Sequence, residues 1–107
     1  MKSITILSTT VEHRIDAERL ATTLLERKLI ACAQISGPIT SVYRWDDKIN
    51  RSEEFTLNVK TTPAACKTVF EVLRKNHPYE LPEIVGTDTS LVEDHYLDWV
   101  HTEVQSD

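Results

Sequence analysis

The stretch Ile39–Lys60, which reads ITSVYRWDDKINRSEEFTLNVK, decides the fold of this 107-residue chain. Its first arm alternates two sets of side chains up to Trp45, and its second arm alternates apolar and polar residues from Phe55 onward. Asp46-Asp47-Lys48, between the two arms, is a turn signal. Since alternation with a period of two is typical of β-strands, the stretch predicts a long antiparallel hairpin with a polar tip.

The residues before this stretch extend its first arm. Ala31–Ile35 is a short apolar run, and Gly37-Pro38 separates it from Ile39. Because proline has no backbone N–H to donate to a neighbouring strand, the Gly-Pro pair predicts a β-bulge or a bend in the arm.

Helices and shorter strands are predicted on both sides of the hairpin. Apolar residues spaced three and four apart, with no Gly or Pro, predict a helix from about 12 to 28. Thr62 and Pro63 predict the start of a second helix, which ends at Asn76, since a hydroxyl cap followed by proline is typical of a first turn. The first predicted strand spans 4–7 and ends at Ser8-Thr9-Thr10. The remaining elements are an extended loop over 77–83, a strand over 83–87 and a helix over 93–105.

The apolar faces of these three helices define a candidate core. Their members are, in order, Ile15, Ala17, Leu20, Ala21, Leu24 and Leu25; Cys66, Val69, Phe70 and Leu73; and Val92, Tyr96, Trp99, Val100 and Val104. Cys66 is interpreted as a core residue, because free cysteine behaves as a small buried hydrophobe.

The predicted order is β-α-β-β-α-β followed by a C-terminal helix. This order predicts an α+β protein with the ferredoxin-like split βαβ arrangement, in which two helices cover one face of a four-stranded antiparallel sheet. The hairpin has apolar residues on both of its faces, whereas a monomer needs only one apolar face to form its core. Its arms are also longer than a usual strand. We therefore expect another subunit to cover the second sheet face or the overhang of the hairpin.

Composition limits the class of protein. With 40% hydrophobic and 27% charged residues the chain has a globular composition, and we expect one domain spanning residues 1–107. The formal net charge of -5 argues against a nucleic-acid partner and against a role at a membrane surface. Two cysteines are too few for a disulfide scaffold, and the sequence has neither a signal-peptide core nor a membrane-spanning apolar run. We therefore expect a cytoplasmic protein.

Motifs typical of catalytic and metal-binding proteins, such as CxxC, HExxH, the P-loop and GxSxG, are missing from the sequence. The candidate site is instead a loop held by two prolines that contains His77, Tyr79, Glu80 and Glu83. Imidazole and carboxylates together can bind a divalent metal or a polar ligand. The alternative interpretation is a structural loop that crosses the sheet edge. The other histidines lie among charged residues and are expected to be solvated: His13, His95 and His101.

Four further positions have weaker signals. Cys32, among small residues at a strand start, is either a core residue or a functional thiol. Lys60 lies just before a predicted helix start, where free N–H groups and the helix dipole favour an anion, although a lysine at a strand end is also typical of a solvated position. Tyr43 and Trp45 near the hairpin tip are typical of interface aromatics.

The strings ERKLIACAQISGPITSVYRWDDKI, FTLNVKTT, HPYELPEI and YLDWV follow one another between Ile4 and about Val100. Together they resemble the CutA family, the divalent-cation tolerance proteins. The resemblance implies a ferredoxin-like subunit in a tight homotrimer, with the long hairpins arranged around the threefold axis. It also implies an association with tolerance to copper and other divalent metals, and no established enzymatic reaction.

The family trimer resembles that of the PII signalling proteins, which bind small effectors in clefts between subunits. By this resemblance the matching cleft is lined by Tyr43, Trp45, Lys60, His77, Tyr79, Glu80 and Glu83. The implied ion is a divalent metal such as Cu²⁺. Its candidate ligands are His77, Glu80 and Glu83, with Cys32 as a weaker candidate.

Three positions depart from the family pattern. Some members have a cysteine where this chain has Ser8, and others have two adjacent histidines where this chain has Asn76 before His77. Losing a thiolate and an imidazole weakens a copper site, because those are ligands that copper prefers. The family usually has glycine at the position of Asp47. This difference changes the expected geometry of the hairpin turn but not the expected fold.

The leading hypothesis is a cytoplasmic homotrimer that binds divalent metal, copper above all, and contributes to the response to metal ions without being an enzyme. The alternative is a PII-like signalling or scaffold protein that binds a small anionic ligand near Lys60 and Pro63 in the clefts between subunits. An acylphosphatase-type enzyme is disfavoured, because the residues after the first strand contain no glycine for an anion-binding loop. An RNA-recognition domain is disfavoured, because the strand over 4–7 has no stacking aromatics.

Overall fold

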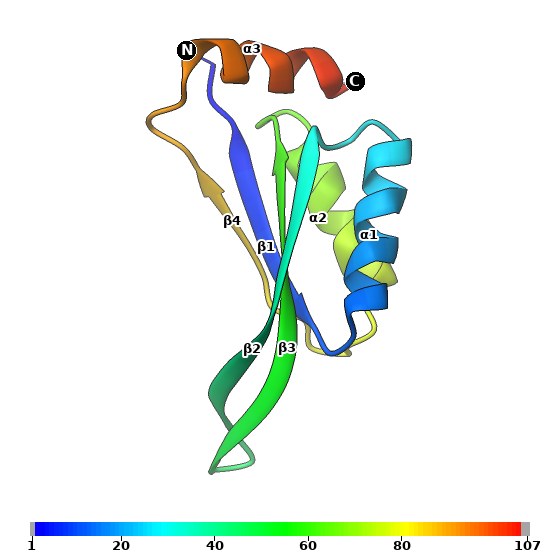
Figure 1. Cartoon of the computed structure of the whole chain (residues 1–107), viewed down its shortest axis with the longest axis vertical. Helices are drawn as coiled ribbons and strands as arrows, with labels where there is room; N and C mark the ends of the chain where they lie inside the picture. Colours follow the sequence, from blue (N-terminus) through cyan, green and yellow to red (C-terminus); the bar gives the residue numbers. More distant parts are fainter. Residues whose placement is uncertain (1, 106–107) are drawn as a thin grey trace.

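The computed structural model describes residues 2–105, which form a four-stranded antiparallel sheet and three helices (Figure 1). The elements are β1 (Thr5–Val11), α1 (Arg14–Glu26), β2 (Cys32–Trp45), β3 (Lys48–Thr61), α2 (Cys66–Asn76), β4 (Ile84–Asp88) and α3 (Asp94–Glu103). The strand order is β2-β3-β1-β4. Helices α1 and α2 cover one face of the sheet, and α3 crosses the end opposite the hairpin (Figure 1). The α+β class and the split βαβ arrangement are confirmed.

Strands β2 and β3 form the long hairpin that the sequence predicts. They pair as far as Trp45 opposite Lys48 at the tip. A register shift between Ser36 and Ile39 confirms the irregularity expected at Gly37-Pro38. The tip of the hairpin extends beyond the rest of the subunit (Figure 1). The longest dimension of the subunit, with the hairpin included, is 44 Å.

Strand β1 is longer than predicted. The expected end at Ser8-Thr9-Thr10 was wrong, because the strand continues to Val11, which pairs with Phe55 of β3. Threonine is β-branched and favours strands. The hydroxyl of Thr9 also has a partner, since its Oγ1 atom lies 2.8 Å from Nε2 of His77. Pairing with β3 and the contact between Thr9 and His77 thus extend β1 through residues that the sequence pattern predicts as the end of the strand.

Helix α2 begins at Cys66, and the predicted start at Thr62 and Pro63 was wrong. The Oγ1 atom of Thr62 accepts a hydrogen bond of 3.3 Å from the backbone N–H of Ala65. The hydroxyl therefore caps the turn that precedes the helix and not the helix itself.

The main core lies between the sheet and the helices α1 and α2. Its buried members are Leu7, Val11, Ala17, Leu20, Ala21, Leu24, Ile30, Leu57, Val59, Val69 and Leu73. Fully burying one large aliphatic side chain of this kind contributes about 1.5–3 kcal/mol. Ile15, Leu25 and Phe70 were expected in the core but are 68%, 43% and 36% exposed. The other apolar residues of their helices already fill the narrow stripe that faces the sheet.

A second core cluster holds α3 against the end of the sheet. Its buried members are Ile4, Ala65, Val100 and Val104. The backbone N–H of Gln105 donates a hydrogen bond of 2.8 Å to the carbonyl oxygen of Lys28. Trp99, expected on the buried side of α3, is 42% exposed. None of the helices in the described part of the chain is long and apolar enough to cross a membrane.

Candidate functional site

His77 directly follows α2 as its C-terminal cap residue, and both of its ring nitrogens have partners within the subunit. Its Nδ1 atom accepts a hydrogen bond of 3.1 Å from the backbone N–H of Tyr79, so the ring proton belongs on Nε2. Nε2 then donates to Oγ1 of Thr9 over 2.8 Å. The imidazole therefore links the loop after α2 to β1.

Burial lowers the pKa of His77 below its ordinary value of 6.5. The backbone of Thr10 and the carboxylates of Asp16 and Glu54 act in the opposite direction, whereas the charge of Arg19 adds to the lowering. The imidazole is therefore neutral at neutral pH, which is the form that a metal ion requires of a histidine ligand.

Tyr79 links the same loop to the hairpin. Its hydroxyl donates a hydrogen bond of 2.8 Å to Oε2 of Glu54 on β3. Burial, and then the hydrogen bond and the charge of Glu54, raise the pKa of Tyr79 well above its ordinary value. The rings of His77 and Tyr79 are in contact, with centroids 5.0 Å apart. The loop is thus fixed at two points, one on β1 and one on β3.

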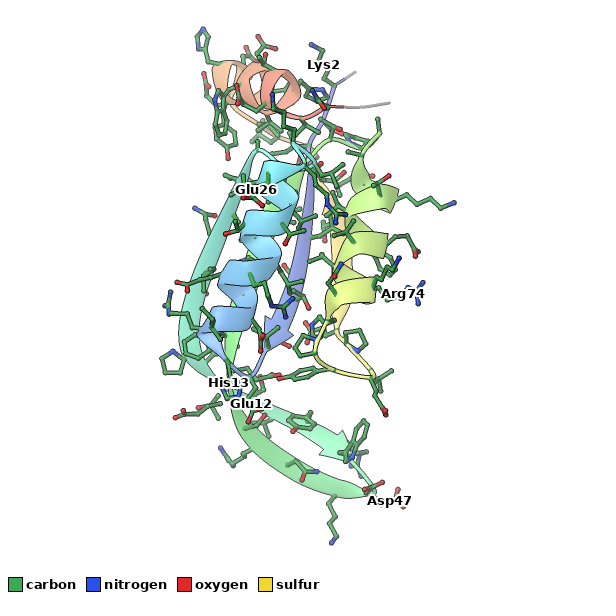
Figure 2. All side chains as sticks on the ribbon, turned by 90° about the vertical axis from the view of Figure 1, so that its right-hand side faces the viewer. Lys2, Glu12, His13, Glu26, Asp47 and Arg74 are labelled. Atoms are coloured by element: carbon green, nitrogen blue, oxygen red, sulfur yellow. The ribbon has the colours of Figure 1, made fainter. Side chains whose placement is uncertain are left out.

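A concavity of about 1140 Å³ lies between this loop, the end of β1 and the hairpin. We call it the acidic concavity, because its lining contains five glutamates: Glu12, Glu53, Glu54, Glu80 and Glu83. The aromatic members of the lining are Tyr43, Trp45, Phe55 and Tyr79. Figure 2 shows Glu12 and His13 at the point where the hairpin leaves the body of the subunit.

Five of the site residues expected from the sequence line this concavity together: Tyr43, Trp45, Tyr79, Glu80 and Glu83. His77 lies beside it and is half-buried. Within the described chain, residues 2–105, no group of three histidine, cysteine, aspartate or glutamate side chains is close enough to hold a metal ion. The single subunit therefore does not bring His77, Glu80 and Glu83 together as a ready set of ligands.

Cys32 and Lys60 lie elsewhere. They are opposite each other in the pairing of β2 with β3, at the end of the hairpin farthest from its tip. The Nζ atom of Lys60 donates a hydrogen bond of 2.7 Å to Oε1 of Gln34. The Sγ atom of Cys32 lies 3.3 Å from the hydroxyl of Tyr96, and burial together with this contact raises the pKa of Tyr96 to about 12. Neither residue lines the acidic concavity of one subunit.

Three acidic residues of the concavity were missed by the sequence analysis: Glu12, Glu53 and Glu54. Glu12 follows Val11, whose partner in β3 is Phe55. Extending β1 by its β-branched residues would have placed Glu12 next to the glutamates of the hairpin. The sequence therefore contained the information that places Glu12 in the site, but the predicted strand ended too early to use it.

The remaining cysteine and histidines have local partners. Cys66 is half-buried against the main core, as expected, and burial raises the pKa of its thiol. His101 was expected to be solvated, but its Nε2 atom lies 2.8 Å from the carbonyl oxygen of Ser3 in a partly buried contact. His95 is exposed beside Glu93, and His13 lines the concavity 3.4 Å from Glu12.

The geometry defines an α+β protein with a long bulged hairpin and an acidic concavity at its base. A family model described as CutA1 divalent ion tolerance protein matches residues 5–103. The chain therefore belongs to the CutA1 divalent ion tolerance family. The predicted family resemblance is confirmed.

Individual relatives are similar over most of the chain. A probable divalent-cation tolerance protein cutA homolog of Encephalitozoon cuniculi is 37% identical over 95% of this chain and 89% of its own length. The divalent ion tolerance protein CutA1 of Ehrlichia chaffeensis has a solved structure with a TM-score of 0.91 and 39% identity, covering 96% of both chains. A protein of Archaeoglobus fulgidus, described as a periplasmic divalent cation tolerance protein CutA, has a TM-score of 0.90 and 32% identity over 95% of this chain and 99% of its own.

Proposed function

We propose that this chain binds a divalent cation, Cu²⁺ above other ions, and contributes to the response to metal ions as a cytoplasmic homotrimer. The observation that carries the proposal is the acidic concavity beside the neutral imidazole of His77. Carboxylates attract a divalent cation, and an imidazole adds a ligand that copper prefers over harder ions. The family's description as divalent ion tolerance proteins supports the same conclusion.

The proposed ligands are His77, Glu80 and Glu83. Because each ring nitrogen of His77 already has a partner in the subunit, coordination must replace its contact with either Thr9 or the backbone of Tyr79. Because three ligand groups do not stand together in the described chain, either the loop moves or a second subunit supplies a ligand. Cys32 remains the weaker candidate, and its position at the far end of β2 restricts it to a separate site in one subunit.

Assembly into a homotrimer is supported by the hairpin. Val42, Tyr43, Trp45 and Ile49 are 53%, 42%, 52% and 73% exposed, and all four lie on its outer half. Tyr43 and Trp45 lie on one face of the hairpin and Val42 and Ile49 on the other, and exposed apolar side chains gathered in this way typically mark a protein interface. We propose that the chain forms one domain and that neighbouring subunits cover these residues, with Lys60 in a cleft that only the assembly completes.

The alternative, a PII-like protein with an anionic ligand, is not favoured. Lys60, its proposed anion partner, donates to Gln34 and does not line the concavity. The glutamates of the concavity would repel an anion. We retain the proposal that the protein acts outside membranes, without nucleic acid and without catalysis. The free thiols of Cys32 and Cys66 support a reducing, cytoplasmic location, although one relative is described as periplasmic.

The proposal is tested by native mass spectrometry of metal-stripped protein, alone and with one equivalent of Cu²⁺ per subunit. We expect a trimer that takes up three ions, one for each subunit. A trimer with a statistical distribution of adducts would contradict a specific metal site and leave the assembly intact. A monomer would contradict the proposed assembly.

A further inference from the structure

The two contacts of the His77 imidazole differ in how firmly the fold holds them. Thr9, the partner of Nε2, is fully buried on β1, where it pairs with Leu57 of β3 on one side and with Ile84 of β4 on the other. The partner of Nδ1 is the backbone N–H of Tyr79, which belongs to the loop between α2 and β4. A change in the loop backbone can therefore break the contact with Tyr79, whereas the contact with Thr9 is fixed by the sheet.

The position of the ring proton also distinguishes the two nitrogens. Nδ1 accepts a hydrogen bond of 3.1 Å from the N–H of Tyr79, so it carries the lone pair, and Nε2 donates its proton to Oγ1 of Thr9 over 2.8 Å. A metal ion binds the lone pair of a neutral imidazole. Binding at Nε2 would require the ring proton to move to Nδ1, where it would face the N–H of Tyr79, a second donor. Binding at Nδ1 requires only that this N–H turn away.

The proposed carboxylate ligands lie on the same side of the ring as Nδ1. Its partner Tyr79 is followed directly by Glu80, and Glu80 and Glu83 are both exposed on the loop and line the acidic concavity. Nε2 instead contacts a buried residue of the sheet. In residues 2–105 no three ligand groups stand together, and the loop's own N–H occupies the lone pair of Nδ1.

We propose that Nδ1 of His77 is the atom that binds the metal ion, and that Thr9 is a positioning residue that holds the imidazole through its Nε2 proton. The inference rests on the proposed function, because it assigns the ligating atom and its support in the same metal site. Histidines that bind metals typically donate their other ring N–H to an acceptor, which fixes the tautomer and the ring orientation. In this chain the acceptor is in place before the ion binds, and the ion displaces only the N–H of Tyr79.

The ligating atom is tested by NMR spectroscopy of the full chain, in its assembled state, with ¹⁵N-labelled histidine and ¹¹³Cd²⁺ as the divalent probe. The signals of His77 are identified by their loss in His77→Gln. We expect coupling to ¹¹³Cd at Nδ1, with the proton retained on Nε2. Coupling at Nε2 would overturn this inference and leave the proposed metal site intact. No response at either nitrogen would remove His77 from the site and overturn both proposals.

The role of Thr9 is tested by two variants. Thr9→Val keeps the β-branched shape and removes the acceptor, whereas Thr9→Ser keeps the hydroxyl. We expect Thr9→Val to weaken Cu²⁺ binding about tenfold or more and Thr9→Ser to stay within about threefold of the parent. Thr61→Val is the matched control, because Thr61 is fully buried on β3 and donates a hydrogen bond of 2.6 Å to the carbonyl oxygen of Leu29. It should bind Cu²⁺ as the parent does.

A readout without metal separates positioning from general destabilisation. The Nε2 proton of His77 should give an NMR signal in the metal-free parent, Thr9→Ser and Thr61→Val, and exchange with water should remove this signal in Thr9→Val. Equal losses of Cu²⁺ affinity in Thr9→Val and Thr61→Val, or in Thr9→Val and Thr9→Ser, would overturn the role of Thr9. Statistical copper adducts on the parent would contradict the proposed function itself. Specific copper binding that Thr9→Val leaves unchanged would contradict this inference alone.

Discussion

The hydroxyl of Tyr79 donates a 2.8 Å hydrogen bond to the carboxylate of Glu54, and so links the loop after α2 to the base of the hairpin. The two residues are 25 positions apart in the sequence. Together with the contact between His77 and Thr9, this bond sets the position of the loop that forms one wall of the acidic concavity.

Replacing Tyr79 should therefore destabilise the subunit. Tyr79→Phe removes the hydroxyl and leaves a half-buried carboxylate without this partner, so we expect a loss of about 1 kcal/mol in the free energy of unfolding. Urea denaturation measures the change. Ser90→Ala, which removes a hydroxyl at an exposed position outside the hairpin and the concavity, is the control and should change stability by less than about 0.5 kcal/mol. Equal stabilities of Tyr79→Phe and the parent would show that the bond contributes nothing.

His77 should give the protein a pH-dependent stability. Its pKa in the folded state is lowered below 6.5, so the unfolded chain binds the proton more tightly. The stability that the neutral imidazole contributes is complete above pH 6.5 and is lost as the pH falls toward the folded-state pKa. Urea denaturation at about pH 7.5 and about pH 5.5 should show a smaller difference for His77→Gln than for the parent. An unchanged difference in His77→Gln, equal to that of the exposed control His95→Gln, would refute this role.

Metal binding should depend on the same residue. We expect His77→Ala to weaken Cu²⁺ binding at least about tenfold, because it removes the one imidazole of the proposed ligand set. The proposed trimer should persist, since His77 lies on the loop and not on the exposed face of the hairpin. Calorimetric titration with Cu²⁺ measures the affinity, and His95→Ala serves as the control. An unchanged affinity would remove His77 from the site.

Assembly should depend on the hairpin aromatics. Trp45 is 52% exposed in the subunit, and we expect Trp45→Ala to weaken the proposed trimer more than it weakens metal binding. Trp99→Ala, on the 42% exposed Trp99 of α3, should have a smaller effect on assembly. Mass measurements on protein diluted to nanomolar concentration compare the two. A Trp45→Ala protein that stays fully trimeric on dilution would count against an interface at this residue.

The bulge should tolerate no side chain at Gly37. This residue has a φ of +138°, and a Cβ atom would lie 2.9 Å from the carbonyl oxygen of Glu54. We expect Gly37→Ala to lower the free energy of unfolding by about 1–3 kcal/mol. Gly86→Ala is the matched control on β4, where the nearest atom would be 3.6 Å away. Comparable denaturation midpoints for both variants would show that the bulge can relax around an added methyl group.

Part of the candidate site could be read from the sequence. The loop with Tyr79, Glu80 and Glu83 was located because two prolines exclude both helix and central strand there. The aromatic residues of the hairpin were located because strand alternation exposes them. Glu12 and Glu54 were missed, since their proximity depends on how far β1 pairs with β3. Lys60 was grouped with the loop, although in one subunit it lies beyond the reach of the concavity.

The sequence by itself determined the order of elements, the long hairpin and the bulge at Gly37-Pro38, because these follow from local periodicity and from the missing N–H of proline. The tertiary structure decided where β1 ends, which apolar residues of α1 stay in water and which carboxylates share a concavity. These features depend on contacts between residues distant in the chain, such as Thr9 with His77 and Tyr79 with Glu54. Local patterns do not specify such contacts, because each one requires two segments to be placed by the packing of the whole core.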